Sequence, residues 1–339
     1  MIDYLKQTGF EKEFAKDKQI VTFILGFLVF AFSIRVVCAA EGSLLGFRWQ
    51  AGKRYVMSLE TSKGLSIKNL PPEADHAVEH EKREFSIVAG ESGQTKGFEL
   101  AVECLSIKYG LNGDISYTLD SSTDPKKDAG IPIAADKRAF LGTKLKYVLA
   151  PDLKVVQVTG TDELVKKMLV HDPDLKGDTS TPFLTEAQLG TNALTELLQE
   201  LIVAGLPGKY LNVGDHWTYR TEQRKESAVV EFKFTFAASE RHLGHDCARI
   251  EIDGDIKSSS NRGNLPSEIP LPKVHGQVKG NLWLDKKLDM LVERTTVEEI
   301  QTEIEMPTAD GKERSMPMTS NEKYTVTTKL IKVEDNCKR

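Results

Sequence analysis

The sequence lacks the short motifs on which the commonest nucleophile and phosphate chemistries depend. Across its 339 residues there is no Gly-x-Ser-x-Gly elbow, no P-loop and no glycine-rich dinucleotide turn. An excess of positive charge is also lacking, because 45 Lys and Arg residues stand against 50 Asp and Glu residues and the formal net charge is −5. A nucleic-acid binder normally concentrates Lys and Arg on a strongly basic face. We therefore expect no nucleic-acid partner, no cofactor and no catalytic residue.

The sequence has one long apolar run, and it lies near the N-terminus. Ile20–Ile34 is wholly apolar or small, follows several lysines and leads into Val37-Cys38-Ala39-Ala40. This order is typical of a signal peptide, with small residues before the cleavage site and a mature chain that starts near Glu41. The alternative is an uncleaved membrane anchor over residues 1–40. In both cases we expect an exported chain, periplasmic or extracellular, that touches the membrane only through this segment.

Cysteine is scarce, with four in the whole chain. Export favours an oxidising compartment, and cleavage would leave Cys104, Cys247 and Cys337. A Cys104–Cys247 disulfide is the pairing that we expect if one forms, because Cys337 lies in a polar tail. The alternative for Cys104 is a small buried side chain, since it is in phase with the apolar residues before it.

What the sequence has in abundance is alternation of apolar and polar residues. Phe98, Leu100, Val102 and Cys104 face one way while Glu99 and Glu103 face the other, as in a half-buried strand. Residues 144–149 and 155–158 predict a hairpin. Helices are predicted over 161–169 and, with a leucine stripe, over Thr185–Ala204. The expected fold class is mainly β (α+β), with antiparallel sheets and a central helical insert.

Two stretches of the chain repeat one plan. Arg48–Tyr55 aligns with Tyr210–Trp217, so that Gly52 meets Gly214 and Tyr55 meets Trp217. Glycine there allows a turn with positive φ, and the aromatic residue covers the core where the next strand begins. We therefore expect two related β-rich units: residues 41–206, which end in helices, and residues 207–339.

The pattern resembles a family of uncharacterised exported bacterial proteins, a domain of unknown function with tandem β-rich units. The residues that carry the resemblance are Arg48-Trp49-Gln50-Ala51-Gly52-Lys53-Arg54-Tyr55, Tyr117-Thr118-Leu119-Asp120-Ser121, Val158-Thr159-Gly160 and Val213-Gly214-Asp215-His216-Trp217. That family supplies no known activity. More loosely, Leu282-Trp283-Leu284-Asp285 is similar to strand ends of periplasmic lipoprotein-carrier and lipid-binding half-barrels.

Three groups of residues are candidates for a site. His76, Glu79 and His80 match the His-x-x-Glu-His pattern of zinc peptidases, which requires a helix, whereas the segment also fits a polar strand or loop. His242, His245 and Cys247 cluster at an expected hairpin turn and would suit zinc or copper, although turns are commonly rich in solvated polar residues. Trp49, Trp217 and Trp283 would line an apolar cleft or pack in the core.

From these features we expect a non-catalytic envelope protein that binds an apolar ligand such as a lipid, or a partner protein. In the ligand version the Thr185–Ala204 helix covers the concave side of a curved sheet. The alternatives are a metal-dependent hydrolase that uses the His-x-x-Glu-His motif and a purely structural interaction protein.

Overall fold

The computed structural model describes thirteen stretches of the chain. They are residues 43–45, 47–68, 76–90, 98–113, 116–128, 131, 133–150, 153–171, 191–202, 205–223, 228–259, 271–306 and 316–335. The chain divides into two units, Met1–Gly42 and Ser43–Arg339, and every described residue belongs to the second. The expected signal peptide or anchor lies outside the described residues. Within the described stretches, no helix has both the length and the apolar character that crossing a membrane requires.

Most of the described chain is β-strand. The large sheet is built from β2 (Lys53–Ile67), β3 (His76–Ala89), β4 (Phe98–Asn112), β5 (Tyr117–Asp120), β6 (Lys144–Leu149), β7 (Val155–Thr159), β9 (His216–Gln223), β10 (Ala228–His242), β11 (His245–Ser258), β12 (Lys273–Asp285), β13 (Met290–Met306) and β14 (Met316–Asp335). A separate two-stranded sheet pairs β1 (Ser43–Leu45) with β8 (Lys209–Leu211).

The described helices are few and fall in the middle of the chain. They are the 3-10 helix η3 (Pro125–Asp128) and the α-helices α2 (Ala134–Phe140), α3 (Thr161–His171) and α5 (Thr191–Leu201). The helix expected over 161–169 is α3. The longer expected helix is α5, and residues 185–190 and 203–204 of that prediction lie outside the described residues.

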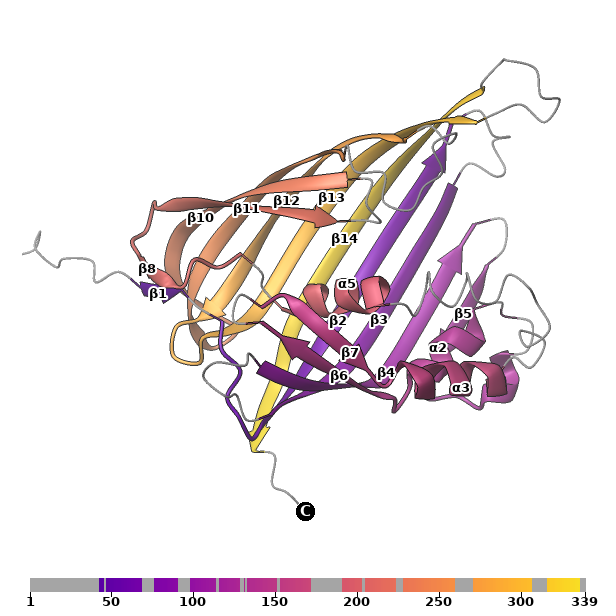
Figure 1. Ribbon diagram of the computed structural model, residues 1–339, viewed down its shortest axis with the longest axis horizontal. Coiled ribbons are helices and arrows are strands. Elements are labelled where there is room, and N and C mark those ends of the chain that lie inside the picture. Colours follow the sequence, from indigo (N-terminus) through magenta and orange to yellow (C-terminus); the bar gives the residue numbers. More distant parts are fainter. Residues whose placement is uncertain are drawn as a thin grey trace, which may run out of the picture. The chain divides into compact units, whose positions relative to one another are not determined.

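The large sheet is antiparallel and continuous. Its strand order is β7-β6-β4-β3-β2-β14-β13-β12-β11-β10-β9, with β5 paired to β4 off this path. The last strand, β14, returns to pair with β2 along most of its length, which brings the first and last strands of the large sheet together in its middle (Figure 1). The predicted fold class, mainly β with antiparallel pairing, is confirmed.

The two faces of the sheet differ, as the alternation of the strands requires. One face carries α5, and we call it the inner face; the opposite one is the outer face. On β4, Leu100, Val102 and Cys104 are 1%, 2% and 3% exposed, as their shared phase predicts. These residues belong to one buried core cluster that also takes in Leu194, Leu198 and Leu201 of α5, which confirms that the leucine stripe packs on the sheet.

Glycines on the inner face permit close approach between neighbouring strands. An added Cβ at Gly280 of β12 would overlap the carbonyl oxygen of Thr295 on β13, and one at Gly276 would overlap the carbonyl oxygen of Glu299. Gly254 of β11 has tight neighbours on β10 as well. Side chains at these positions would push the strands apart, so the close approach of these strands requires glycine.

Candidate functional site

The space between α5 and the inner face is not filled by side chains. It forms a cavity of about 620 Å³, which we call the α5 cavity. Its walls include Glu79 of β3 and Tyr219 of β9, two strands seven places apart in the sheet order. In a flat sheet they would be roughly 33 Å apart, at about 4.8 Å per strand. The sheet therefore curves around α5, as the concave arrangement expected from the sequence requires.

One wall of the α5 cavity is apolar. It comes from β9 to β12 and consists of Tyr219, Phe232, Phe234, Ile252, Val278 and Leu282. The rings of Phe232 and Phe234 stack at 5.7 Å between centroids, and Tyr219 stacks on Phe232 at 6.5 Å. These side chains would be in contact with any molecule that enters the cavity, and contact with apolar atoms would remove their surface from water.

The opposite wall is polar. It comes from β2, β3, β13 and β14 and consists of Thr61, Lys63, Glu79, Glu81, Arg83, Arg294, Thr296, Glu298, Glu322 and Tyr324. Lys63 pairs with Glu322 at 3.0 Å. Because the two walls belong to separate groups of neighbouring strands, the cavity is amphipathic from one side to the other.

A buried charge cluster lies at the β3 side of this polar wall. Glu81 binds Arg83 at 2.7 Å through one carboxylate oxygen and Lys137 of α2 at 2.8 Å through the other. Burial alone would raise the pKa of Glu81, but the two cations outweigh it and hold that pKa below its ordinary value. Burial and the neighbouring Arg83 lower the pKa of Lys137 against the pull of Glu81. The cluster thus depends on all three charges.

The α5 helix is fixed to the inner face by its C-terminal turn. Arg294 of β13 donates to the carbonyl oxygens of Gln199, Glu200 and Ile202, and Thr328 of β14 donates to that of Glu200 at 2.6 Å. The last carbonyls of a helix have no hydrogen-bond partner within the helix, and a cation there also interacts favourably with the negative end of the helix dipole. The sheet therefore holds the helix that covers the cavity.

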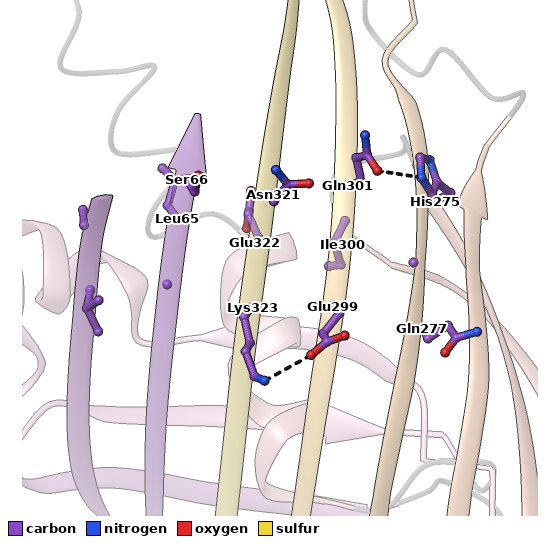
Figure 2. A pocket seen from close by; sticks show the side chains of 14 residues that line it. Leu65, Ser66, His275, Gln277, Glu299, Ile300, Gln301, Asn321, Glu322 and Lys323 are labelled. Atoms are coloured by element: carbon purple, nitrogen blue, oxygen red, sulfur yellow. Dashed lines mark hydrogen bonds and ion pairs between the residues drawn. The ribbon is translucent and has the colours of Figure 1, made fainter. Parts of the chain in front are cut away.

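A second hollow lies on the outer face, near the ends of β2, β3, β12, β13 and β14. It has a volume of about 600 Å³, and we call it the outer groove. Figure 2 shows Lys323 bound to Glu299 and His275 bound to Gln301 across neighbouring strands, at 3.1 and 3.0 Å. The side chains of Lys323 and Glu299 are 65% and 67% exposed. Since these groups satisfy one another in water, the α5 cavity is the better candidate site.

The three tryptophans do not line either hollow. Trp49 is buried between Phe47 and Tyr55, at ring distances of 5.1 and 4.8 Å. Trp217 donates from Nε1 to the Gly205 carbonyl, and Trp283 stacks on the His242 ring at 4.1 Å on the outer face. The alternative assignment, packing, describes them better, and the aromatic residues of the cavity are Tyr219, Phe232, Phe234 and Tyr324.

The residues of the candidate metal site at the β10–β11 hairpin, His242, His245 and Cys247, do not share a ligand; the two histidines each have a different carboxylate partner. His242 Nε2 lies 2.6 Å from a carboxylate oxygen of Glu293, and His245 Nδ1 lies 2.7 Å from one of Asp285. Cys247 is buried, and burial followed by the charge of Asp285 raises the pKa of its thiol to about 11. Among the described residues, no three His, Cys, Asp or Glu side chains gather as ligands for a metal ion.

The His-x-x-Glu-His segment is strand, not helix. His76, Glu79 and His80 all belong to β3, which begins at His76. Four residues of extended chain span roughly 13 Å, so the two histidines lack the one-turn spacing of the zinc pattern. Alternation also places Glu79 on the inner face and His80 on the outer one, and Glu79 lines the α5 cavity.

The expected Cys104–Cys247 disulfide is absent. Both cysteines are free and buried, on β4 and β11, which lie six places apart in the sheet order. Burial raises the pKa of Cys104 to about 12, so both thiols are protonated at neutral pH.

Sequence reasoning missed most of the cavity residues. Lys63, Arg294 and Glu298 stand on strands far apart in sequence and are brought together by the pairing of β2, β14 and β13. One sequence signal could have revealed these residues. It is a charged residue on the face of a strand whose other residues are buried. Arg294 and Glu298 are in phase with Thr296 and Ile300, which are 8% and 5% exposed.

Comparisons with known proteins give a family and weak structural likenesses. No curated protein matches the chain in sequence. A structure titled "Lipid-protein interactions in lipovitellin" is similar with a TM-score of 0.43 and 8% identity, over 85% of this chain and 26% of that one. The chain thus spans about a quarter of its length. DynF from the dynemicin biosynthesis pathway of Micromonospora chersina is similar with a TM-score of 0.18 and 6% identity, over 86% of this chain and 85% of that one.

The family match covers most of the central chain. The model of a family of unknown function, DUF6263, matches residues 95–289, from β4 to the end of β12. This stretch is more than half of the sequence and includes α5 and the whole apolar wall of the α5 cavity. The protein therefore belongs to the DUF6263 family, whose function is unknown, in agreement with the resemblance noted from its sequence.

Proposed function

We propose that this protein binds an amphipathic, lipid-like molecule in the α5 cavity and that it does so without catalysis. The observation that carries the proposal is the open space of about 620 Å³ between an apolar wall and a polar one. That volume is within the roughly 300–1,000 Å³ of ligand pockets, which are mostly apolar with a few polar groups. A space filled by side chains would have argued against a ligand.

The apolar wall supplies the affinity in this proposal. An alkyl chain laid along Phe232, Phe234 and Val278 would leave water, at about 0.8 kcal/mol for each buried methylene. A chain of ten methylenes would gain roughly 8 kcal/mol before the cost of immobilising it is subtracted. The polar wall would then face the head group of the same molecule. If the expected export segment acts as such, this binding takes place in the cell envelope.

The test is native mass spectrometry of the purified full-length chain, followed by organic extraction of the same sample. We expect a copurifying mass of lipid size. Thr296→Trp should reduce the amount of the copurifying molecule, because Thr296 lines the cavity and the indole ring would occupy the space. The matched control is Thr295→Trp, one residue away on the outer face. A bare polypeptide mass, with no binding of added alkyl probes, would contradict the proposal and favour a structural interaction protein.

We also propose that the sheet combines two related units, which meet where β14 pairs with β2. Two equivalent turns support this: Gly52 and Gly214 have φ of 78° and 98°, and each donates its N–H to the next strand, at Ala89 and Phe236. Nothing lies within 4 Å of an added Cβ at either glycine. Alanine at each should therefore cost a similar backbone strain of about 1–2 kcal/mol in urea unfolding, and clearly unequal costs would count against the equivalence.

A further inference from the structure

The cations that line the α5 cavity are all paired with carboxylates of the same lining. The pairs are Lys63–Glu322 at 3.0 Å, Arg83–Glu81 at 2.7 Å and Arg294–Glu200 at 2.8 Å. Glu81 is also bound by Lys137 of α2, at 2.8 Å. An anionic head group would therefore have to compete with a carboxylate that is already in place, at a site where water is partly excluded and screening is weak.

The remaining carboxylates of the lining are not free either. Burial and then the charge of Glu79 raise the pKa of the Tyr109 hydroxyl, and Glu79 also attracts the Lys137 ammonium group. Glu196 and Glu298 each have a partner of their own. A cationic head group would thus have to compete with these partners. Because the charges of the wall are already paired, an ionic head group of either sign is disfavoured.

The cavity also has uncharged polar side chains, and two of them lie close together. Thr296 of β13 and Gln199 of α5 both line it. Arg294 lies two residues before Thr296 on the same face of β13 and donates to the Gln199 carbonyl at 3.3 Å, which brings this turn of the helix next to Thr296. A hydroxyl and a side-chain amide both donate and accept hydrogen bonds without carrying charge.

Two buried donors in the wall favour oxygen atoms in the ligand. The Nε–H groups of Arg83 and Arg294 have no hydrogen-bond partner in the described part of the chain. An oxygen atom of a ligand or of a water molecule accepts from such a donor, whereas an ammonium group has no acceptor to offer. The charge of Arg294 is already balanced by Glu200, so the oxygen that its Nε–H requires can be uncharged.

The register of the sheet leads from Thr296 to the apolar wall. Thr296 is opposite Gly280 of β12, and Gly280 is opposite Ile252 of β11. Ile252 in turn is opposite Phe234 of β10, whose ring stacks on that of Phe232. Because Gly280 has no side chain, no side chain of this row stands between Thr296 and Ile252. An alkyl chain that begins beside Thr296 can therefore cross β12 at Gly280 and reach the aromatic rings.

We infer that the ligand of the α5 cavity is an amphiphile with an uncharged, hydroxyl-bearing head group of the glycosyl or glycerol kind. The head lies beside Thr296 and Gln199, and the alkyl chain crosses β12 at Gly280 towards Ile252 and the stacked rings of Phe232 and Phe234. Hydroxyl groups match the threonine hydroxyl and the glutamine amide without displacing an ion pair. This inference rests on the proposed function and adds the chemistry of the head group to it.

The test compares four probes with the same ten-carbon chain: decyl glucoside, 1-decanoylglycerol, decanoate and decyltrimethylammonium. Each is titrated calorimetrically into the full-length chain at neutral pH, below the concentration at which it forms micelles. We expect the tighter of the two uncharged probes to bind about tenfold more tightly than either charged probe, and its identity distinguishes a glycosyl from a glycerol head. Tighter binding of a charged probe, or equal binding of all four, would overturn the inference while leaving the proposed function intact. Failure of all four to bind would overturn both.

Variants that remove one polar group each locate the head group. Thr296→Val and Gln199→Met keep the size of the side chain, and each should weaken the tighter uncharged probe by about fivefold without weakening decanoate. The control is Thr295→Val on the outer face, where Thr295 faces Thr327 at 3.5 Å, and this variant should keep the wild-type affinity. Circular dichroism checks that each variant is folded. Wild-type affinity in both cavity variants, or an equal loss in the control, would contradict the placement of the head group.

Discussion

The guanidinium of Arg294 lies 2.8 Å from the carboxylate of Glu200 and also donates to the Glu200 carbonyl at 2.6 Å. One residue of the central sheet thus holds both the side chain and the backbone of the last turn of α5. The side chain of Arg294 is 14% exposed, so water replaces these bonds poorly when they are lost. This contact ties the cover of the α5 cavity to its polar wall.

Arg294→Ala should destabilise the protein by about 2 kcal/mol in urea unfolding, because it leaves buried helix carbonyls and a partly buried carboxylate without their donor. The matched control is Lys323→Ala, which breaks the exposed Lys323–Glu299 pair between β14 and β13 and should cost less than about 1 kcal/mol. Equal costs for the two variants would show that α5 is not held in this way.

The charge cluster around Glu81 predicts a loss of stability in acid. The folded pKa of Glu81 is below its ordinary value of 4.5, so its contribution is fully present above that pH and is lost as the pH falls through the folded pKa. Glu81→Gln should therefore be less stable than the wild type at pH 7, and the gap should shrink below about pH 4.5. A gap that stays constant down to pH 3 would contradict this account.

The close approach of β12 to β13 predicts unequal tolerance of alanine among the strand glycines. Gly280→Ala should cost about 1–3 kcal/mol or more, since the new Cβ overlaps the backbone of β13. Gly64→Ala on β2 is the control, because the nearest atom to its new Cβ is the carbonyl oxygen of Lys323 at 3.9 Å. Its cost should be within about 0.5 kcal/mol. Both values come from urea unfolding, and similar losses at the two sites would argue against a strand approach that requires glycine.

The two buried thiols should be inert in the folded protein. Burial raises the pKa of Cys104 to about 12 and that of Cys247 to about 11, so almost no thiolate is present at pH 8. In a variant with Cys38→Ser and Cys337→Ser, Ellman's reagent should label neither thiol until denaturant is added, and then both. Prompt labelling of either thiol without denaturant would contradict their burial. Failure of one to react after unfolding would point to oxidation.

Local patterns in the sequence were enough to predict many of the strands and the helices α3 and α5, whereas α2 was not predicted. The alternation from Phe98 to Cys104 gives a strand with one buried face, and the leucines of 185–204 give a helix that packs on the sheet. These are near-neighbour regularities that the backbone geometry of strand and helix imposes directly. The order of the strands has no such local signature. The pairing of β14 with β2 joins residues far apart in the chain.

The site could not be predicted for the same reason. Charged residues such as Arg294 and Glu298 occupy buried phases of β13, where the sequence alone does not distinguish them from exposed polar residues of a strand. Their partners come from α5 and β14, and only the assembled sheet brings them together. For Trp49, Trp217 and Trp283 the sequence left two roles open, lining an apolar cleft or packing, and they pack against Phe47, Phe234 and His242. Residue type alone did not separate the lining of a cavity from the core.

The central claim is that the α5 cavity holds the alkyl chain of an amphiphile, and a crystal structure with a brominated probe tests it most directly. The probe is decyl glucoside with bromine at the end of the chain, located by its anomalous scattering. We predict a bromine peak beside Phe232 and Val278, which is lost in Thr296→Trp and kept in Thr295→Trp. Bromine confined to the outer groove, or an α5 cavity that stays free of bromine at a saturating concentration of the probe, would contradict the account.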